Sequence, residues 1–184
     1  MTLSKPWTHW LNATIERIRQ AKTRNRRPIR LTVMGIGQEM FGDDAAGVEV
    51  ARRLQPLFSD HLQVIEACYV PENFTGAVRR HEPDIVLLVD AAHMGAEPGA
   101  VRWLDWRDVT GFSASSHTGP LSSLAQFISV TMDCEVWIIG IEPADLTMNA
   151  PLSASVKLAV DQVAAGITNA AQPIILETAA DHRN

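Results

Sequence analysis

Two adjacent carboxylates, Asp43 and Asp44, are the first residues of this chain whose types and spacing could support chemistry. They lie within the glycine-rich sequence GIGQEMFGDDAAG at residues 35–47. The apolar run over residues 29–36 predicts a parallel strand buried on both faces, and the amphipathic residues 44–57 predict a helix. Asp44 is therefore expected in the first helical turn, at the carboxyl edge of a sheet, where open α/β proteins bind their ligands.

Two more residues with ligand chemistry are expected at the same edge. Asp90 ends the run 84–90, which is apolar between its acidic ends and is the clearest strand of the chain, and His117 lies in a loop that leads into a helix. Two carboxylates and one imidazole from three loops form a ligand set for a divalent transition metal, with positions left open for water or substrate. Asp44, Asp90 and His117 are thus candidate metal ligands, and His93 is a rival ligand because of its position.

Each candidate also has an ordinary structural explanation. An acid in the first turn of a helix complements the helix dipole, which is worth about 0.3–1 kcal/mol. Asp43 is expected to cap the helix, a role that contributes about 0.5–2 kcal/mol of stability and would leave catalysis intact. Aspartate at a strand end often forms a turn, and a histidine flanked by serines is commonly exposed. The metal-site prediction therefore depends on the expected proximity of the three residues.

The remaining pattern alternates between strands and helices. Further strands are predicted at residues 62–69, 99–103 and 134–141, the second of them at a sheet edge, and further helices at residues 6–22, 71–80, 120–129 and 150–167. This order predicts an α/β fold, a three-layer α/β/α sandwich with a largely parallel central sheet and an extra N-terminal helix.

A chain of 184 residues is long enough for one well-buried core. We expect residues 1–28 to form an appended helix, with its tryptophans packed on the domain, and a basic linker. Residues 29–172 are expected to form a single α/β domain, and residues 173–184 a tail to which no structure is assigned. The basic run in residues 22–27 could instead dock an acidic partner, but one cluster does not establish that role.

Composition excludes several classes of partner. The chain has 16 Lys and Arg against 21 Asp and Glu, which gives a net charge of -5. A negative net charge does not attract nucleic acid or an anionic membrane electrostatically. No apolar stretch reaches the roughly 18–20 residues that span a bilayer, and the polar N-terminus lacks the apolar core of a signal peptide. The scarcity of cysteine suits a reducing compartment. We expect a soluble, cytoplasmic protein.

Nucleophilic catalysis is disfavoured by the sequence. Ser115 and Ser116 precede His117, but the chain has no Gly-x-Ser-x-Gly elbow, and neighbours in sequence rarely point their side chains at one another productively. Cys68 and Cys134 lie in apolar strand-like runs, where burial keeps a thiol protonated and inaccessible.

A dinucleotide-binding oxidoreductase is the main alternative function. The sequence GIG at residues 35–37 matches the first half of the Rossmann fingerprint, and Glu66 is a candidate ribose ligand. Met40 stands where the third glycine belongs, and acidic residues crowd the place where a pyrophosphate needs backbone donors and positive potential. Negative charge there repels phosphate and attracts a cation.

Several motifs in one order identify a resemblance that covers residues 29–166. They are GIG at 35–37, GDDAAG at 42–47, PEN at 71–73, IVLLVDAAHMG at 85–95, PG at 98–99, SHTGPL at 116–121 and IGIEP at 139–143. In these motifs the chain resembles the nickel-iron hydrogenase maturation proteases. These endopeptidases remove the C-terminal extension of a hydrogenase large subunit once its metal is in place. The last two motifs look most like the branch that serves formate-hydrogenlyase-type enzymes.

The resemblance assigns the family's metal-binding and catalytic positions to Asp44, Asp90 and His117, and it places His93 outside the ligand set. It also implies roles in precursor recognition for Gly37, Gln38 and Asp43. The family usually has asparagine at the position of Gln38, so the longer amide here is a departure in the recognition loop.

The resemblance further implies that the physiological metal is nickel, carried by the large-subunit precursor. Imidazole and carboxylate ligands would also accept zinc or cadmium. The expected partner is that precursor, and the protein is expected to act as a monomer. A non-catalytic chaperone or metal carrier stays open as a third function class, which would bind precursor without changing its length.

Overall fold

The computed structural model describes residues 6–22, 28–108 and 121–181 of the chain. Five strands form one sheet in the order β2-β1-β3-β5-β4. The strands are β1 (Leu31–Ile36), β2 (Leu62–Cys68), β3 (Ile85–Ala91), β4 (Val101–Leu104) and β5 (Glu135–Ile141). Four strands pair in parallel, and β4 pairs antiparallel with β5. The predicted, largely parallel sheet with an edge strand near residue 101 is therefore confirmed.

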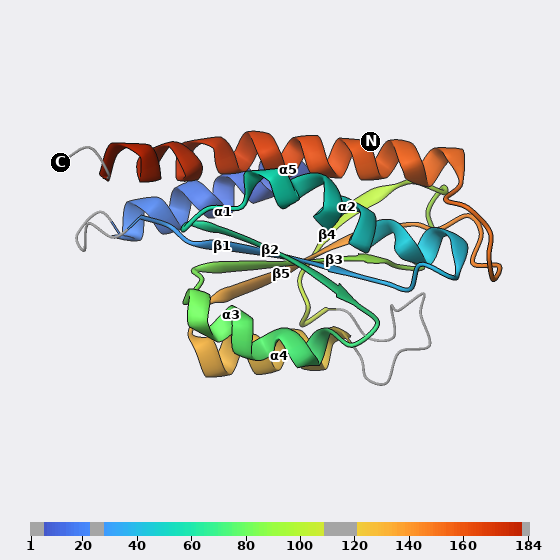
Figure 1. Ribbon diagram of the computed structural model, residues 1–184, viewed down its shortest axis with the longest axis horizontal. Coiled ribbons are helices and arrows are strands. Elements are labelled where there is room, and N and C mark those ends of the chain that lie inside the picture. The colour runs from blue at the N-terminus through green and yellow to red at the C-terminus, as the bar shows by residue number, and fades with distance from the viewer. Residues whose placement is uncertain (1–5, 23–27, 109–120, 182–184) are drawn as a thin grey trace.

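Helices cover both faces of this sheet, as Figure 1 shows. The α-helices are α1 (Trp7–Lys22), α2 (Ala46–Leu54), α3 (Thr75–His81), α4 (Leu121–Met132) and α5 (Ala154–Asp181), with short 3-10 turns η1 (Gly42–Ala45), η2 (Gln55–Leu57) and η3 (Pro71–Phe74). Helices α1, α2 and α5 lie on one face, and α3 and α4 lie on the other. The predicted three-layer α/β/α sandwich with its extra N-terminal helix is confirmed.

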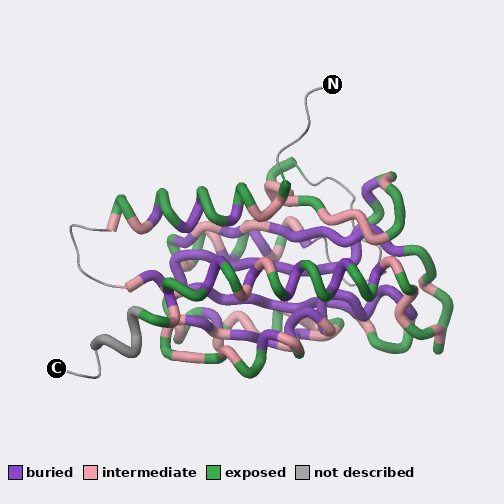
Figure 2. Tube along the Cα trace, turned by 90° about the horizontal axis from the view of Figure 1, so that it is seen from above, coloured by how far each residue is buried: buried purple, intermediate pink, exposed green. Residues whose placement is uncertain are grey.

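Alternation along the strands separates two apolar cores. On β3, Leu87 and Val89 pack in the core beneath α1, α2 and α5, whereas Val86 and Leu88 pack in the core beneath α3 and α4. Figure 2 shows the buried strands enclosed by helices whose outer residues are exposed. Because side chains alternate with a period of two, Asp90 continues the second series and belongs to the face of α3 and α4.

The first helix is part of the larger core. Leu11 and Ile15 of α1 are buried in the same cluster as the sheet residues beneath α2 and α5. Trp7 packs against this cluster, but Trp10 is 46% exposed. The prediction that the tryptophans of this helix pack on the domain is therefore right for Trp7 and wrong for Trp10.

The last helix is longer than predicted. The sequence pattern predicts a helix that ends at residue 167 and assigns no structure to residues 173–184, but α5 continues to Asp181 with Pro173 inside it. A proline in a helix interior costs about 3 kcal/mol. Ala171 and Ile174 on either side of it are fully buried, and this packing keeps the helix on the core. The proposed boundary after residue 172 thus falls inside a helix.

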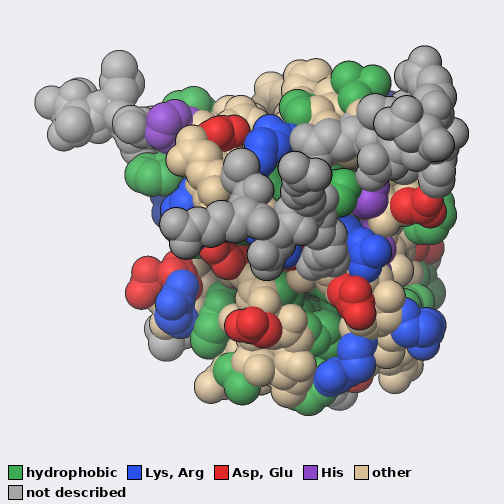
Figure 3. Space-filling view, turned by 90° about the vertical axis from the view of Figure 1, so that its left-hand side faces the viewer, with side chains coloured by type: hydrophobic (Ala, Val, Ile, Leu, Met, Phe, Trp, Pro, Cys, Tyr) green, Lys and Arg blue, Asp and Glu red, His purple; other side chains and the backbone are tan. Residues whose placement is uncertain are grey.

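Charges at the amino edge of the sheet are mixed. Figure 3 views the molecule from the side where the parallel strands begin, and its basic and acidic side chains are interspersed. Arg17 pairs with Glu135 at 2.6 Å, and Lys22 pairs with the buried carboxylate of Asp84. Across the described residues, every helix is too short or too polar to cross a membrane.

Candidate metal and catalytic site

The glycine-rich turn after β1 folds back on itself and fixes the first candidate ligand. Gly37 has a φ of 138°, and a Cβ at this residue would overlap the carbonyl oxygen of Asp44. The backbone N–H of Gln38 donates a hydrogen bond to Oδ2 of Asp44 at 2.8 Å. The Asp44 side chain is consequently held in one orientation and is only 3% exposed.

The segment that carries Asp44 lies directly on the ends of two strands. Residues Gly42–Ala45 form a 3-10 turn, and α2 begins only at Ala46, so the predicted helix start at residue 44 was too early. A Cβ at Gly47 would overlap the carbonyl oxygens of Ile36 and Val89. This close approach brings the start of α2 over the carboxyl ends of β1 and β3, where Asp90 lies.

Asp90 is a buried carboxylate close to a second one. It is 2% exposed, and burial raises its pKa well above the ordinary value, with the charge of Asp44 raising it further. The backbone N–H of Ala91 donates to this carboxylate, whereas its Oδ1 atom has no hydrogen-bond partner among the described residues. Two buried carboxylates that repel each other form a pair that a cation would stabilise.

The structure thus brings together two of the three predicted ligands. Asp44 and Asp90 interact electrostatically, as predicted from the strand order. His117 lies outside the described residues. Among the residues that are described, no group of three or more metal-binding side chains occurs. The rival His93 instead faces Glu142, with Nδ1 and Oε1 3.4 Å apart.

Asp43 does not cap a helix. Phe41 occupies the N-cap position of η1, which has no side-chain capping bond. Asp43 is fully buried, and its Oδ2 accepts hydrogen bonds from the backbone N–H groups of Ala144 and Asp145, while its Oδ1 accepts one from Ser153. Its side chain therefore ties the loop after β5 to the turn that carries Asp44, which corrects the predicted capping role.

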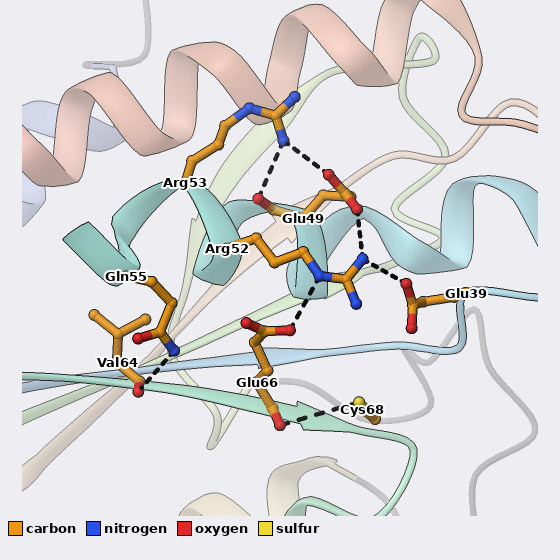
Figure 4. A network of polar contacts seen from close by, with 8 residues as sticks. All are labelled: Glu39, Glu49, Arg52, Arg53, Gln55, Val64, Glu66 and Cys68. Atoms are coloured by element: carbon orange, nitrogen blue, oxygen red, sulfur yellow. Dashed lines mark hydrogen bonds and ion pairs between the residues drawn. The ribbon is translucent and has the colours of Figure 1, made fainter. Parts of the chain in front are cut away.

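A cluster of ion pairs supports the same turn from the surface (Figure 4). The Arg52 guanidinium contacts Glu39 in the turn, Glu49 in α2 at 2.8 Å and Glu66 in β2 at 3.0 Å. This contact lowers the pKa of Glu39. Glu66, the candidate ribose ligand of the dinucleotide alternative, is thus engaged with Arg52.

Comparison with known proteins identifies the family. A model of the hydrogenase maturation protease family HycI matches residues 48–170. The Hydrogenase 3 maturation protease of Escherichia coli K12 is 33% identical over 129 residues, which cover 70% of this chain and 82% of that protein. The chain belongs to the hydrogenase maturation protease family. It is therefore an endopeptidase of hydrogenase maturation.

Solved structures of hydrogenase maturation proteases agree with this fold. The crystal structure of the NiFe hydrogenase maturation protease HycI from Thermococcus kodakarensis KOD1 matches with a TM-score of 0.71 and 29% identity, covering 79% of this chain and 94% of that one. The solution structure of the endopeptidase HycI from Escherichia coli matches with a TM-score of 0.67 and 30% identity, covering 74% and 88%. Membership in this family argues against the alternative function, a dinucleotide-binding oxidoreductase.

Both cysteines of this hydrogenase maturation protease have raised thiol pKa values. Cys134 is buried just before β5, and burial, followed by nearby carboxylates, raises its pKa to about 12. Cys68 is half-buried at the end of β2, where burial again raises its pKa. The burial of Cys134 is as predicted for an inaccessible thiol, whereas Cys68 is half-buried at the end of β2 and does not lie within a buried run as predicted.

Sequence reasoning missed one buried carboxylate of the protease. Glu142 follows β5, is 5% exposed and accepts hydrogen bonds from two backbone N–H groups in the loop after β3. The sequence signal was available, since an acidic residue ends the apolar run 136–141.

Proposed function

We propose that this endopeptidase removes the C-terminal extension of a nickel-loaded hydrogenase large-subunit precursor. In this proposal Asp44, Asp90 and His117 hold the nickel that the precursor carries. The observation that supports it best is the buried pair Asp44 and Asp90, in which the Oδ1 atom of Asp90 has no hydrogen-bond partner among the described residues. A buried charge of this kind is costly unless a cation or a proton compensates it.

The donor set fits such a cargo. Carboxylate oxygens and imidazole nitrogen are ligands that nickel accepts, and zinc or cadmium would bind to the same set. When bound, the ion would supply Lewis-acid polarisation of a peptide carbonyl or of a water molecule. The protein itself positions the two carboxylates, because the Gln38 N–H orients Asp44 and the pairing of β3 with β5 fixes Asp90.

Recognition is proposed to involve the turn at residues 37–41, which carries Gly37 and Gln38 next to Asp44. Asp43 holds this turn in place through the loop after β5. We further expect one copy of the protease to act on one precursor, so size-exclusion chromatography of the pure protein should show a monomer.

The test is cleavage of a matched precursor with and without nickel. Asp44→Asn, Asp90→Asn and His117→Ala should each abolish the shortening of nickel-loaded precursor on a denaturing gel, confirmed by mass spectrometry. Asp84→Asn removes a buried carboxylate at the opposite edge of the sheet and should cleave normally. Full cleavage by all three ligand variants, or equal cleavage of nickel-free precursor, would contradict the proposal.

The same experiment separates the endopeptidase from a non-catalytic carrier. A chaperone or metal carrier would form a complex with the precursor and leave its length unchanged. Shortening by the purified wild-type protein alone supports the proposed reaction, and binding without shortening favours the carrier.

A further inference from the structure

We propose that Glu142 is a positioning residue of the protease, which holds Met94 against the sheet beside Asp90. The proposal rests on the proposed metal-binding role of Asp90. It assigns a task to a buried carboxylate that the proposed reaction does not itself use.

Glu142 organises the loop after β3 through its side chain. Its Oε2 atom accepts hydrogen bonds from the backbone N–H of Met94 at 2.7 Å and of Ala96 at 3.1 Å. Its Oε1 atom faces Nδ1 of His93 at 3.4 Å. Bonds from backbone N–H groups to a carboxylate are charge-assisted and stronger than those between neutral groups. One carboxylate therefore fixes the backbone at two positions, Met94 and Ala96, of an otherwise irregular segment.

The last residue of β5 and the residue after it hold both ends of the same loop through backbone hydrogen bonds. The N–H of Ala92 donates to the carbonyl of Ile141 at 2.9 Å, and the N–H of Gly99 donates to the carbonyl of Glu142 at 2.8 Å. The N–H of Glu142 in turn donates to the carbonyl of Ala100 at 2.9 Å. Between these two ends, residues 93–96 are held by the Glu142 side chain and by Arg102, whose Nη1 donates to the carbonyl of Met94 at 3.4 Å.

This path places a thioether next to the candidate ligand. Asp90 aligns with Gly140 across β3 and β5, and aligned residues of parallel strands project to the same face. A Cβ at Gly140 would lie 2.9 Å from the sulfur of Met94, which is 8% exposed. The absent side chain of Gly140 thus leaves a space beside Asp90, and Met94 occupies it.

Loss of the Glu142 carboxylate would free the Met94 side chain to leave its place beside Asp90. The N–H groups of Met94 and Ala96 would lose their acceptor, and an unsatisfied buried donor favours a rearranged loop. Water would then reach the space beside Asp90, and electrostatic interactions weaken as the local dielectric constant rises. We expect Asp90 to hold a divalent cation less tightly as a result.

The test measures nickel affinity by isothermal titration calorimetry, with nickel chloride and the full-length folded chain. Glu142→Ala should lower the affinity about 10-fold or more, within the 10- to 100-fold range seen when groups that support metal ligands are lost. Glu142→Gln keeps an oxygen acceptor for Met94 and Ala96, so it should retain most of the affinity. Rescue by glutamine would show that placement of the loop, rather than the charge, is what matters.

Asp84→Ala is the matched structural control. Asp84 is also a buried carboxylate that accepts a backbone hydrogen bond, from Arg30 at 2.9 Å, but it precedes β3 at the opposite edge of the sheet. Its loss should lower the melting temperature and leave nickel affinity unchanged. Equal nickel affinity in the wild type and in folded Glu142→Ala would overturn the proposal. An equal loss of affinity in Glu142→Gln and Glu142→Ala would overturn it as well.

A second variant decides the matter if Glu142→Ala does not fold. Gly140→Ala places a methyl group against the flexible end of Met94 and should displace it while Glu142 stays in place. Weakened nickel binding by this variant supports the proposed role of Met94 beside Asp90, and unchanged binding contradicts it. If the wild-type chain and Asp44→Asn bind nickel equally weakly, the proposed metal site itself is wrong, which is a separate result.

Discussion

The backbone of Gly47 in α2 lies directly against the carbonyl oxygen of Val89 in β3, with no space for a side-chain carbon between them. This contact sets the height of α2 above the sheet and so the position of Asp44 relative to Asp90. Helices that pack on sheets through larger residues stay farther away. The adjacency of the two carboxylates thus depends on a glycine five residues after the turn begins at Gly42.

Gly47→Ala is expected to separate helix and sheet. Overpacking of this kind costs about 1–3 kcal/mol, and here the added methyl group meets rigid backbone. Urea unfolding should show the loss, and nickel binding should weaken in parallel.

Gly76→Ala is the control, because a Cβ there would have its nearest neighbour 3.6 Å away at the end of the Arg80 side chain. Alanine in that helical position should stabilise the protein by about 0.5–1 kcal/mol. Similar stability of the two alanine variants would show that the close contact at Gly47 is unimportant.

Asp43→Asn should reduce both stability and cleavage. The amide offers one acceptor oxygen where the carboxylate offers two, so at least one backbone N–H in the segment 144–153 loses its partner. Leaving a buried donor unsatisfied costs about 1–3 kcal/mol. Because the same contacts hold the turn that carries Asp44, precursor shortening should slow. Stability can be followed by thermal unfolding and cleavage by gel.

Asp145→Asn provides the comparison for this experiment. Its carboxylate lies in the same loop but is exposed and bonds only locally, to the N–H of Thr147 at 2.8 Å. It should change stability and cleavage little. A normal rate of cleavage by a destabilised Asp43→Asn would restrict this aspartate to a structural role.

Cys134 should resist alkylation in the folded protein. With a pKa of about 12, its thiol is almost wholly protonated at pH 8, and it is 8% exposed. Thiols react with iodoacetamide as thiolates, so the half-buried Cys68 should be modified first. Peptide mass mapping after a timed reaction would reveal the order. Modification of Cys134 at the rate seen in urea would contradict this environment.

The sequence predicted the sheet and the pairing of Asp44 with Asp90 because both follow from local patterns. Continuous apolar runs specify buried parallel strands, and strand order then places their ends at one edge. The hydrogen-bond partners of Asp43 and Glu142 could not be predicted, because they lie far away in the chain: Asp43 accepts bonds from residues about a hundred positions later. The passage of α5 through Pro173 likewise depends on packing that no local pattern shows.

Asp90→Asn should stabilise the metal-free protein at neutral pH while it abolishes function. The folded-state pKa of Asp90 lies well above its ordinary value of 3.8, chiefly because of burial and then because of the charge of Asp44. Between these two pKa values the folded state binds more protons than the unfolded state does, so this group lowers stability as pH rises through that interval. Asparagine has no charge to bury and removes the penalty.

Chemical unfolding with a chelator present, at pH values from 4 to 8, would measure this effect. The stability advantage of Asp90→Asn should grow as pH rises above the ordinary pKa of 3.8, and it should be smallest at the acid end, where the largest share of the unfolded-state carboxyl is protonated. Nickel should then stabilise the wild type and not the variant, because the cation compensates the charge that asparagine lacks. A variant less stable than wild type at pH 7 would mean that the Asp90 carboxylate is already compensated within the folded chain.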